Sequence, residues 1–207
     1  MRIAVTGTDN GQLAGRLAAL GHDVVPCPLI EIEAIGPDEI DVSGYDWVVV
    51  TSRNGARELA RRMQGQPARL AAIGPGTAEE LPRPPDFVAT VSTQEGLLAA
   101  LPRPAGRVLF AGAEGARRLL VDELGADFVP LYRTNELRPP VFPDVDLVVL
   151  ASASAARAYA ALDASAPAVS IGPQTTAAAA GVDVVAEAES HDLDGVVEAV
   201  RRIVPPS

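Results

Sequence analysis

Four polar turns of the chain are rich in small hydroxyl and glycine residues, and each lies between an apolar run and a helix-like segment. The turns form two pairs that repeat along the chain, TSRNG with IGPGT and ASAS with IGPQT. The residues there that could bind an anion are Thr51, Ser52, Asn54, Gly55, Gly74, Thr77, Ser152, Ser154, Gly172 and Thr175. Backbone N–H groups at a helix start are unpaired and lie at the positive end of the helix dipole. Several such turns could bind a polyanion without lysine, although each alone is typical of ordinary helix capping.

Four further side chains are candidates for proton or thiol chemistry. Tyr132 lies in an extended stretch between repeats, where its hydroxyl could face a site or its ring could simply be buried. His191 precedes the last helical segment and could be a general acid–base, but a lone histidine in a polar turn is more often solvated. His22 is most simply a charge near a helix end, and Cys27, between two prolines, a small buried hydrophobe.

Cofactor and metal motifs are missing from the sequence. The spacing of Gly7 and Gly11 does not match a dinucleotide fingerprint, and there is neither a phosphate-binding loop nor a lysine to complete one. No G-x-S-x-G elbow is present for a serine nucleophile. One cysteine and two histidines do not make a zinc site of usual composition. We therefore expect no cofactor and no metal.

The composition bounds the class of protein and its partners. The chain has 207 residues, a formal net charge of −10 and 4% aromatic residues. An acidic surface with few aromatic side chains is a poor partner for nucleic acid, so we expect none. No apolar run approaches the length of a membrane span, and no signal-like segment is present, so we expect no membrane contact. A single cysteine fits a reducing compartment, and we expect a cytoplasmic protein.

The order of the apolar runs predicts an α/β fold built from a duplicated plan. Residues 2–31 align with 107–134 as β-α-β units, and residues 45–101 align with 146–203 as β-α-β-α-β-α units. Continuous β-branched runs such as Trp47–Val50 are typical of parallel strands covered on both faces. We expect two doubly wound parallel-sheet domains with about five strands each.

The repeat leaves two domain pairings open. Each domain could combine neighbouring units, or the two middle units could form one domain and the outer two the other. The second pairing needs two chain crossings, and two stretches that look extended, near 28–35 and 132–139, could provide them. We favour it and expect a discontinuous domain of residues 1–33 plus 135–207, a second domain of residues 36–131, and a two-stranded connector.

Several motifs together resemble the uroporphyrinogen-III synthase family. They are VVVTSRNGARELARRM, AAIGPGTAEEL, FVPLYRT and VSIGPQTTAAAAGVDVVAEAESHDLDGVVEAV, spread along most of the chain. The combination is fairly specific, whereas no single motif is. The resemblance implies two α/β domains joined by a two-stranded connector, which agrees with the favoured pairing.

The resemblance also implies an activity and its residues. The family cyclises hydroxymethylbilane, a linear tetrapyrrole with eight carboxylates, losing water and inverting ring D through a spiro intermediate, with no cofactor or metal. It is a hydro-lyase of tetrapyrrole and heme biosynthesis, and we expect a monomer. Tyr132 matches the connector tyrosine that is the family's best candidate for the acid. The family's hydroxyl positions match Thr51, Ser52, Thr77, Ser152 and Thr175.

Two departures from the family pattern keep a second function open. The family often has an arginine after its first strand, where this chain has Thr6–Asp9, and another where it has Ala111-Gly112. The arginines that could substitute are Arg53, Arg117, Arg118 and Arg133. The alternative is a non-catalytic anion- or tetrapyrrole-binding or regulatory module with two lobes and the same fold.

Overall fold

The computed structural model describes residues 1–8 and 10–203. The chain divides into two compact units, Met1–Glu31 with Thr134–Ser207 (unit 1) and Ile32–Arg133 (unit 2). Each unit has its own sheet, so the outer repeats share one domain and the middle repeats share the other. The crossed pairing is therefore confirmed. Asp9, the last residue of the sequence stretch Thr6–Asp9, lies outside the described residues.

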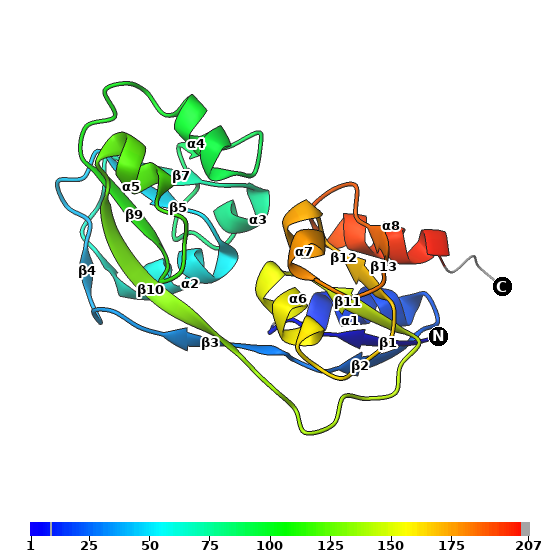
Figure 1. The fold of residues 1–207 in the computed structure, drawn as a ribbon. Coiled ribbons are helices and arrows are strands. Elements are labelled where there is room, and N and C mark those ends of the chain that lie inside the picture. The colour runs from blue at the N-terminus through cyan, green and yellow to red at the C-terminus, as the bar shows by residue number, and fades with distance from the viewer. Residues whose placement is uncertain (9, 204–207) are drawn as a thin grey trace. The chain divides into compact units, whose positions relative to one another are not determined.

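Unit 1 holds a parallel sheet in the order β13-β12-β11-β1-β2 (Figure 1). Its strands are β1 (Arg2–Val5), β2 (Asp23–Pro26), β11 (Leu147–Leu150), β12 (Ala168–Ser170) and β13 (Val184–Glu187). Its helices are α1 (Gly11–Ala19), α6 (Ala153–Ala160), α7 (Pro173–Ala178) and α8 (Leu193–Ile203).

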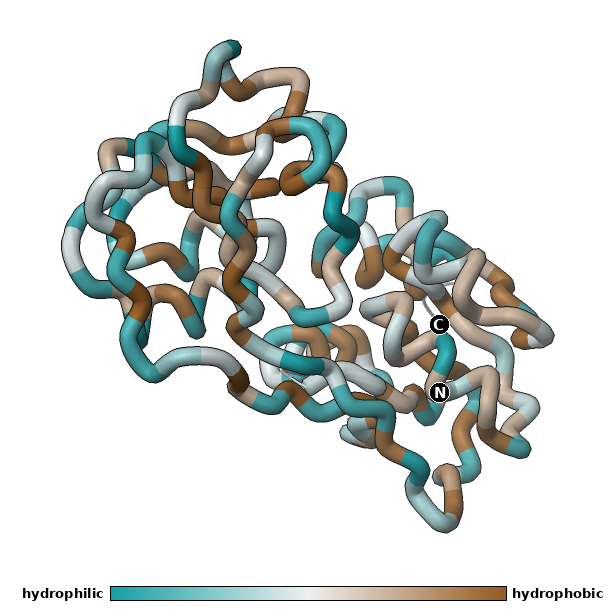
Figure 2. Tube along the Cα trace, turned by 60° about the vertical axis from the view of Figure 1, so that its left-hand side comes forward, coloured by the Kyte–Doolittle hydropathy of each residue, from teal (hydrophilic) through white to brown (hydrophobic). Residues whose placement is uncertain are grey.

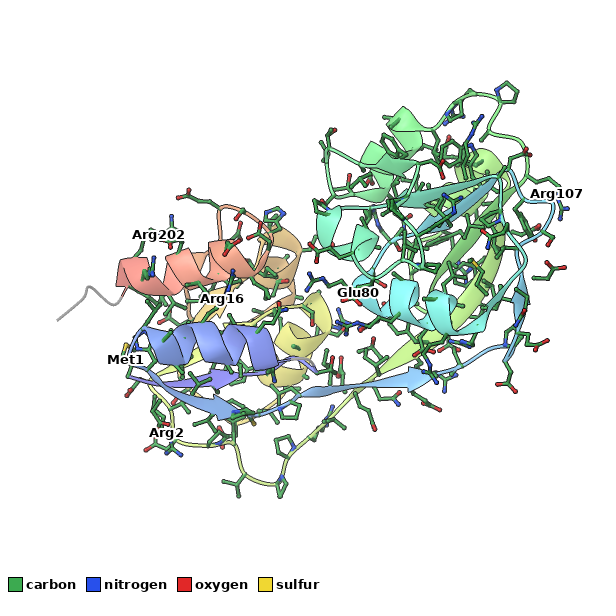
Figure 3. The ribbon with its side chains drawn as sticks, turned by 180° about the vertical axis from the view of Figure 1, so that it is seen from behind. Met1, Arg2, Arg16, Glu80, Arg107 and Arg202 are labelled. Carbon is green, nitrogen blue, oxygen red and sulfur yellow. The ribbon has the colours of Figure 1, made fainter. Side chains whose placement is uncertain are left out.

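Helices cover both faces of this sheet, which explains its unbroken apolar strands. Ile3 and Val5 pack in one cluster with residues of α1 and α8, whereas Ala4 packs in another with residues of α6. Successive strand residues point to opposite faces, so a strand covered on both sides must be apolar at every position. At the surface, Arg16 of α1, which is labelled in Figure 3, pairs with Asp194 of α8 at 2.7 Å.

Unit 2 holds a larger sheet in the order β3-β10-β9-β5-β7-β8 and a small pair, β4-β6. The strands are β3 (Ile30–Ala34), β4 (Ile40–Asp41), β5 (Trp47–Val50), β6 (Met63–Gln64), β7 (Arg69–Ala72), β8 (Phe87–Val88), β9 (Val108–Ala113) and β10 (Asp127–Glu136). The helices are α2 (Arg53–Arg62), α3 (Pro75–Ala78), α4 (Gln94–Ala100) and α5 (Leu119–Leu124). The β4-β6 pair was not expected, because two-residue strands leave no periodic pattern in a sequence.

The core of unit 2 follows the same two-faced rule. Val48 and Val50 pack with Leu59 of α2, whereas Trp47 and Val49 pack in the cluster that holds residues of α4 and α5. Hydrophobic segments recur along the traces of both units in Figure 2. The apolar strands thus bring the polar turns that follow them to the carboxyl edge of each sheet, where α/β proteins bind ligands.

The chain passes between the units through the neighbouring strands β3 and β10. The amide of Leu137 donates to the carbonyl of Leu29 at 2.8 Å, and the amide of Ile35 donates to the carbonyl of Leu131 at 3.0 Å. Because one residue number rises as the other falls, the two strands are antiparallel. This is the expected two-stranded connector.

Candidate active site

The turn after β5 opens helix α2 at the carboxyl edge of unit 2. Ser52 has extended backbone angles, φ −161° and ψ 154°, and its Oγ accepts a hydrogen bond from the amide of Gly55 at 3.0 Å. This bond satisfies one of the unpaired amides of the first turn. Thr51 precedes the cap and Asn54 lies in the first turn, both half-buried. Ser52 is therefore the N-cap.

Tyr132 of β10 meets this cap. Its hydroxyl lies 2.9 Å from the Oγ of Ser52, and either oxygen can be the donor. The tyrosine is 6% exposed, and burial raises the pKa of its phenol above the ordinary value, while the bond with Ser52 acts in the opposite direction. The phenol is therefore protonated at neutral pH. The oxygen of Ser52 accepts a hydrogen bond from the amide of Gly55, and the Ser52 hydroxyl can donate one to the phenol oxygen. In that arrangement the phenol O–H is free to donate to a ligand.

The second turn of unit 2 is tied to the first by an arginine. Arg53 donates from Nε to the carbonyl of Gly76 at 3.0 Å and pairs through Nη2 with Glu79 at 2.9 Å. Gly74 caps α3, and a side chain there would meet the Oγ of Ser92 at 2.7 Å. Thr77 is buried within α3. The structure therefore brings Ser52 and Tyr132 into contact, and Arg53 joins the two turns.

Unit 1 carries the matching pair of turns. Ser152, with φ −161° and ψ 155°, caps α6 by accepting from the amide of Ala155 at 3.2 Å. The hydroxyl of Ser154 accepts from Nη2 of Arg157 at 3.2 Å. Gly172 caps α7, and Thr175 is buried within that helix. The structure places all of these residues at the starts of α6 and α7.

His191 lies against the Gly172 turn, a neighbour that the sequence did not indicate. A side-chain carbon built at Gly172 would come within 2.8 Å of Cδ2 of the imidazole. The histidine itself is exposed. Ser92 takes the same position against Gly74 in unit 2, so the two contacts follow the repeat.

The remaining arginines named as possible substitutes are all engaged with protein groups. Arg117 forms two hydrogen bonds with Glu95, at 2.7 and 2.9 Å, and Arg133 forms two with Glu114 at the same distances. The guanidinium of Arg118 lies 3.6 Å from the ring centroid of Phe128. An anionic ligand would have to compete with Glu95 for Arg117 and with Glu114 for Arg133.

The other sequence candidates, Cys27 and His22, belong to unit 1. Cys27 is half-buried, and burial raises the pKa of its thiol. His22 follows α1 and is half-buried, and desolvation lowers the pKa of its imidazole. Within residues 1–8 and 10–203, no group of three His, Cys, Asp or Glu side chains could hold a metal ion. In the same part of the chain, no helix is long and apolar enough to cross a membrane.

Comparison with known proteins supplies the family. A family model described as "Uroporphyrinogen-III synthase HemD" matches residues 11–198. The fold is similar to uroporphyrinogen-III synthetase of Helicobacter pylori 26695, with a TM-score of 0.68 and 18% identity over 98% of this chain and 100% of the other. It is also similar to a mutant uroporphyrinogen III synthase of the extremely thermophilic bacterium Thermus thermophilus, with a TM-score of 0.61 and 18% identity over 100% of both chains. No curated protein matches the chain significantly.

Proposed function

Because the chain belongs to the uroporphyrinogen-III synthase family, we propose that it cyclises hydroxymethylbilane to uroporphyrinogen III in tetrapyrrole and heme biosynthesis. The family model spans most of the chain and both units. The two-domain fold, similar in outline to two bacterial enzymes of this name, supports the same conclusion.

The observation that carries the mechanism is the buried hydroxyl pair of Tyr132 and Ser52, whose oxygens are 2.9 Å apart. Cyclisation begins when the C–O bond of the hydroxymethyl group breaks, and the leaving oxygen needs a proton to depart as water. A buried phenol that stays protonated at neutral pH can donate it, and Ser52 can stabilise the phenolate that forms. The proton returns when the newly joined pyrrole ring regains its aromatic state. No redox partner enters this balance, so the proposed enzyme is a hydro-lyase without a cofactor.

The polar turns are proposed to bind the carboxylates of the substrate. The set comprises Thr51, Ser52, Asn54, Gly55, Gly74, Thr77, Ser152, Ser154, Gly172 and Thr175. Their hydroxyls and backbone amides can accept an acidic substrate although the chain carries a net charge of −10. The entropy lost when a flexible linear substrate is brought into the right geometry is a large part of the barrier to ring closure, and binding of its carboxylates can supply that ordering. The proposal extends to a monomer that acts in the cytoplasm without nucleic acid.

One observation favours a second candidate, a non-catalytic tetrapyrrole-binding module of the same fold. Arg53, Arg117 and Arg133 each already pair with a protein carboxylate, and the guanidinium of Arg118 lies over the ring of Phe128, so a substrate carboxylate would have to compete at three of the four substitute arginines. Such a module would bind a tetrapyrrole but would not direct its closure.

The experiment that separates the two uses the full chain and freshly made hydroxymethylbilane. The product is oxidised and its isomers are resolved by chromatography. Type III product above the spontaneous rate is expected. Type I product alone, at the rate seen without protein, would refute the catalytic proposal, and retained binding of the substrate would then favour the module.

A further inference from the structure

Strand β10 changes register immediately before Tyr132. Pro130 lies opposite Gly112 of β9, but Tyr132 lies opposite Ala113, so Leu131 is an extra residue on β10. A bulge of this kind re-aims the side chains that follow it, and such bulges occur often beside active sites. The direction in which the phenol of Tyr132 points therefore depends on how the backbone at Leu131 is held.

The backbone at Leu131 is held by Arg62, the last residue of α2. Nη2 of Arg62 donates to the carbonyl of Leu131, while Nη1 donates to the carbonyls of Ile35 at 2.6 Å and Pro37 at 3.2 Å. The same Leu131 carbonyl also accepts from the amide of Ile35 at 3.0 Å. One guanidinium thus fixes the bulge of β10 to the turn that follows β3.

The environment of Arg62 makes this contact rigid. Its side chain is 11% exposed, and its charge is balanced by Glu58, 14% exposed, at 2.9 Å. A buried charge that loses a partner is costly, so the guanidinium cannot easily leave its acceptors. The turn after β3 also approaches the strand at Pro130. Gly36 of this turn has a φ of +80°, and a side chain there would come within 2.3 Å of the Pro130 carbonyl oxygen. The turn therefore lies directly against the bulge.

We propose that Arg62, with Glu58 as its counterion, is a positioning residue that fixes the Leu131 bulge and so holds the phenol of Tyr132 against Ser52. Its kinetic consequence rests on the proposed function, whereas its structural consequence does not. The competing explanation is that Arg62 merely complements the dipole at the end of α2. Arg61 offers a matched control, because it lies in the same turn and pairs with Glu58 at 3.0 Å but is 70% exposed.

The structural consequence is tested by NMR of protein labelled with ¹³C at Cζ of tyrosine. The chain has three tyrosines, and Tyr132→Phe assigns the signal of interest. In Arg62→Gln we expect that signal to shift and the pKa of the phenol to fall toward its ordinary value, because the ring loses its fixed buried place. The signal of Tyr159 should not move, and Arg61→Gln should leave all three signals unchanged. An unmoved Tyr132 signal in Arg62→Gln overturns the proposal.

The kinetic consequence is tested on the same variants. Arg62→Gln should lower kcat by about tenfold to a hundredfold, the range expected when a reacting group is displaced by about 1 Å. KM should change by less than about twofold, because Arg62 does not contact substrate in this account. Arg61→Gln should keep the unmodified kcat. If Arg62→Gln does not fold, Arg62→Lys replaces it, because lysine keeps the charge but lacks the planar set of donors of arginine. The Tyr132 NMR signal and kcat of that variant then test the proposal.

The outcomes separate this inference from the proposed function. If the unmodified chain makes no type III product, the function is wrong and the NMR result still decides the role of Arg62. If Tyr132→Phe loses activity while Arg62→Gln and Arg62→Lys keep both the signal and kcat, the function stands and the positioning role is wrong.

Discussion

Ser52 in unit 2 and Ser152 in unit 1 begin two helices with the same backbone geometry, yet the side chains around them differ. Their φ and ψ angles agree within a degree, and each accepts a capping hydrogen bond, at 3.0 Å and 3.2 Å. Ser52 also meets the hydroxyl of Tyr132 at 2.9 Å. The residues after β2 in unit 1 are Cys27, Pro28 and Leu29, none of which has a hydroxyl. The duplicated turn supplies a capped helix in both units, and in unit 2 the cap also meets a buried phenol.

Each unit has a third turn, which lies before α4 in unit 2 and before α8 in unit 1, and the capping residues of these third turns differ. In unit 2, Thr93 caps α4 by accepting from the amide of Gly96 at 3.1 Å. In unit 1, Asp192 accepts from the amide of Gly195 at 2.8 Å, before α8. The same structural task is therefore performed by a neutral side chain in one unit and by a titrating one in the other.

The largest expected effect is that of Tyr132→Phe. Removing the hydroxyl should lower kcat for type III product by at least about tenfold, the low side of acid–base contributions. Tyr159→Phe is the matched control, since that hydroxyl donates to the carbonyl of Ala166 at 2.8 Å within the core of unit 1. Steady-state rates of both variants should show a loss for Tyr132 alone. Equal rates in the two variants would remove Tyr132 from the acid role.

The next prediction compares the two caps directly. Ser52→Ala and Ser152→Ala should each lower the free energy of unfolding by about 1 kcal/mol, the usual cost of losing a serine N-cap. Ser52→Ala should also lower kcat several-fold, because the phenol loses its partner. Chemical denaturation and steady-state kinetics on the two variants test both statements. An equal fall in kcat for Ser152→Ala would contradict the prediction that only the cap in unit 2 takes part in the reaction.

A smaller effect is expected in the acid stability of the third turns. The amide of Gly195 lowers the pKa of Asp192 below its ordinary value of 3.8, with a further contribution from the hydroxyl of Ser190. A carboxyl with a lowered folded pKa stabilises the fold above its unfolded pKa, and that stability is lost as the pH falls through the folded value. Asp192→Asn should therefore flatten the loss of stability below about pH 4, as measured by thermal unfolding against pH. Thr93→Ser should leave the profile unchanged, and an unaltered slope in Asp192→Asn would contradict this account.

The smallest effect concerns the exposed ion pair of Glu95 with Arg117. The hydrogen bonds from Arg117 are the largest cause that lowers the pKa of Glu95 to about 2. Arg117→Gln should raise that pKa toward its ordinary value of 4.5 with little change in stability, because exposed pairs contribute little. Carboxyl NMR titration measures the shift. A pKa that stays near 2 in the variant would mean that the helix start, and not the arginine, holds the carboxylate.

Much of the fold was predictable from the sequence, because its signals are local. The apolar runs at Trp47–Val50 and Leu147–Leu150 become buried strands, and the serine and glycine turns become helix caps. The two stretches that look extended, near 28–35 and 132–139, favour the crossed pairing. These features follow from periodicity and capping chemistry, which act over a few residues.

The contact between Tyr132 and Ser52 depends on tertiary register, which the sequence does not carry. Asp23 lies opposite Arg2, but Asp127, its counterpart in the repeat, lies opposite Leu109 rather than Arg107. This difference and the bulge at Leu131 bring Tyr132 to the level of the Ser52 turn. The role of Arg62 was equally hidden, because an arginine in the last turn of a helix is typical of a solvated surface residue.

The central claim is that Ser52 and Tyr132 act as one catalytic pair in unit 2. A double-mutant cycle on kcat for type III product tests it most directly, using Ser52→Ala, Tyr132→Phe and the two combined. The account predicts that the combined variant keeps the kcat of Tyr132→Phe alone, because Ser52 affects the bond-breaking step through the phenol, whereas its contact with substrate carboxylates affects KM. Losses that multiply would show that the two hydroxyls act independently and would contradict the account.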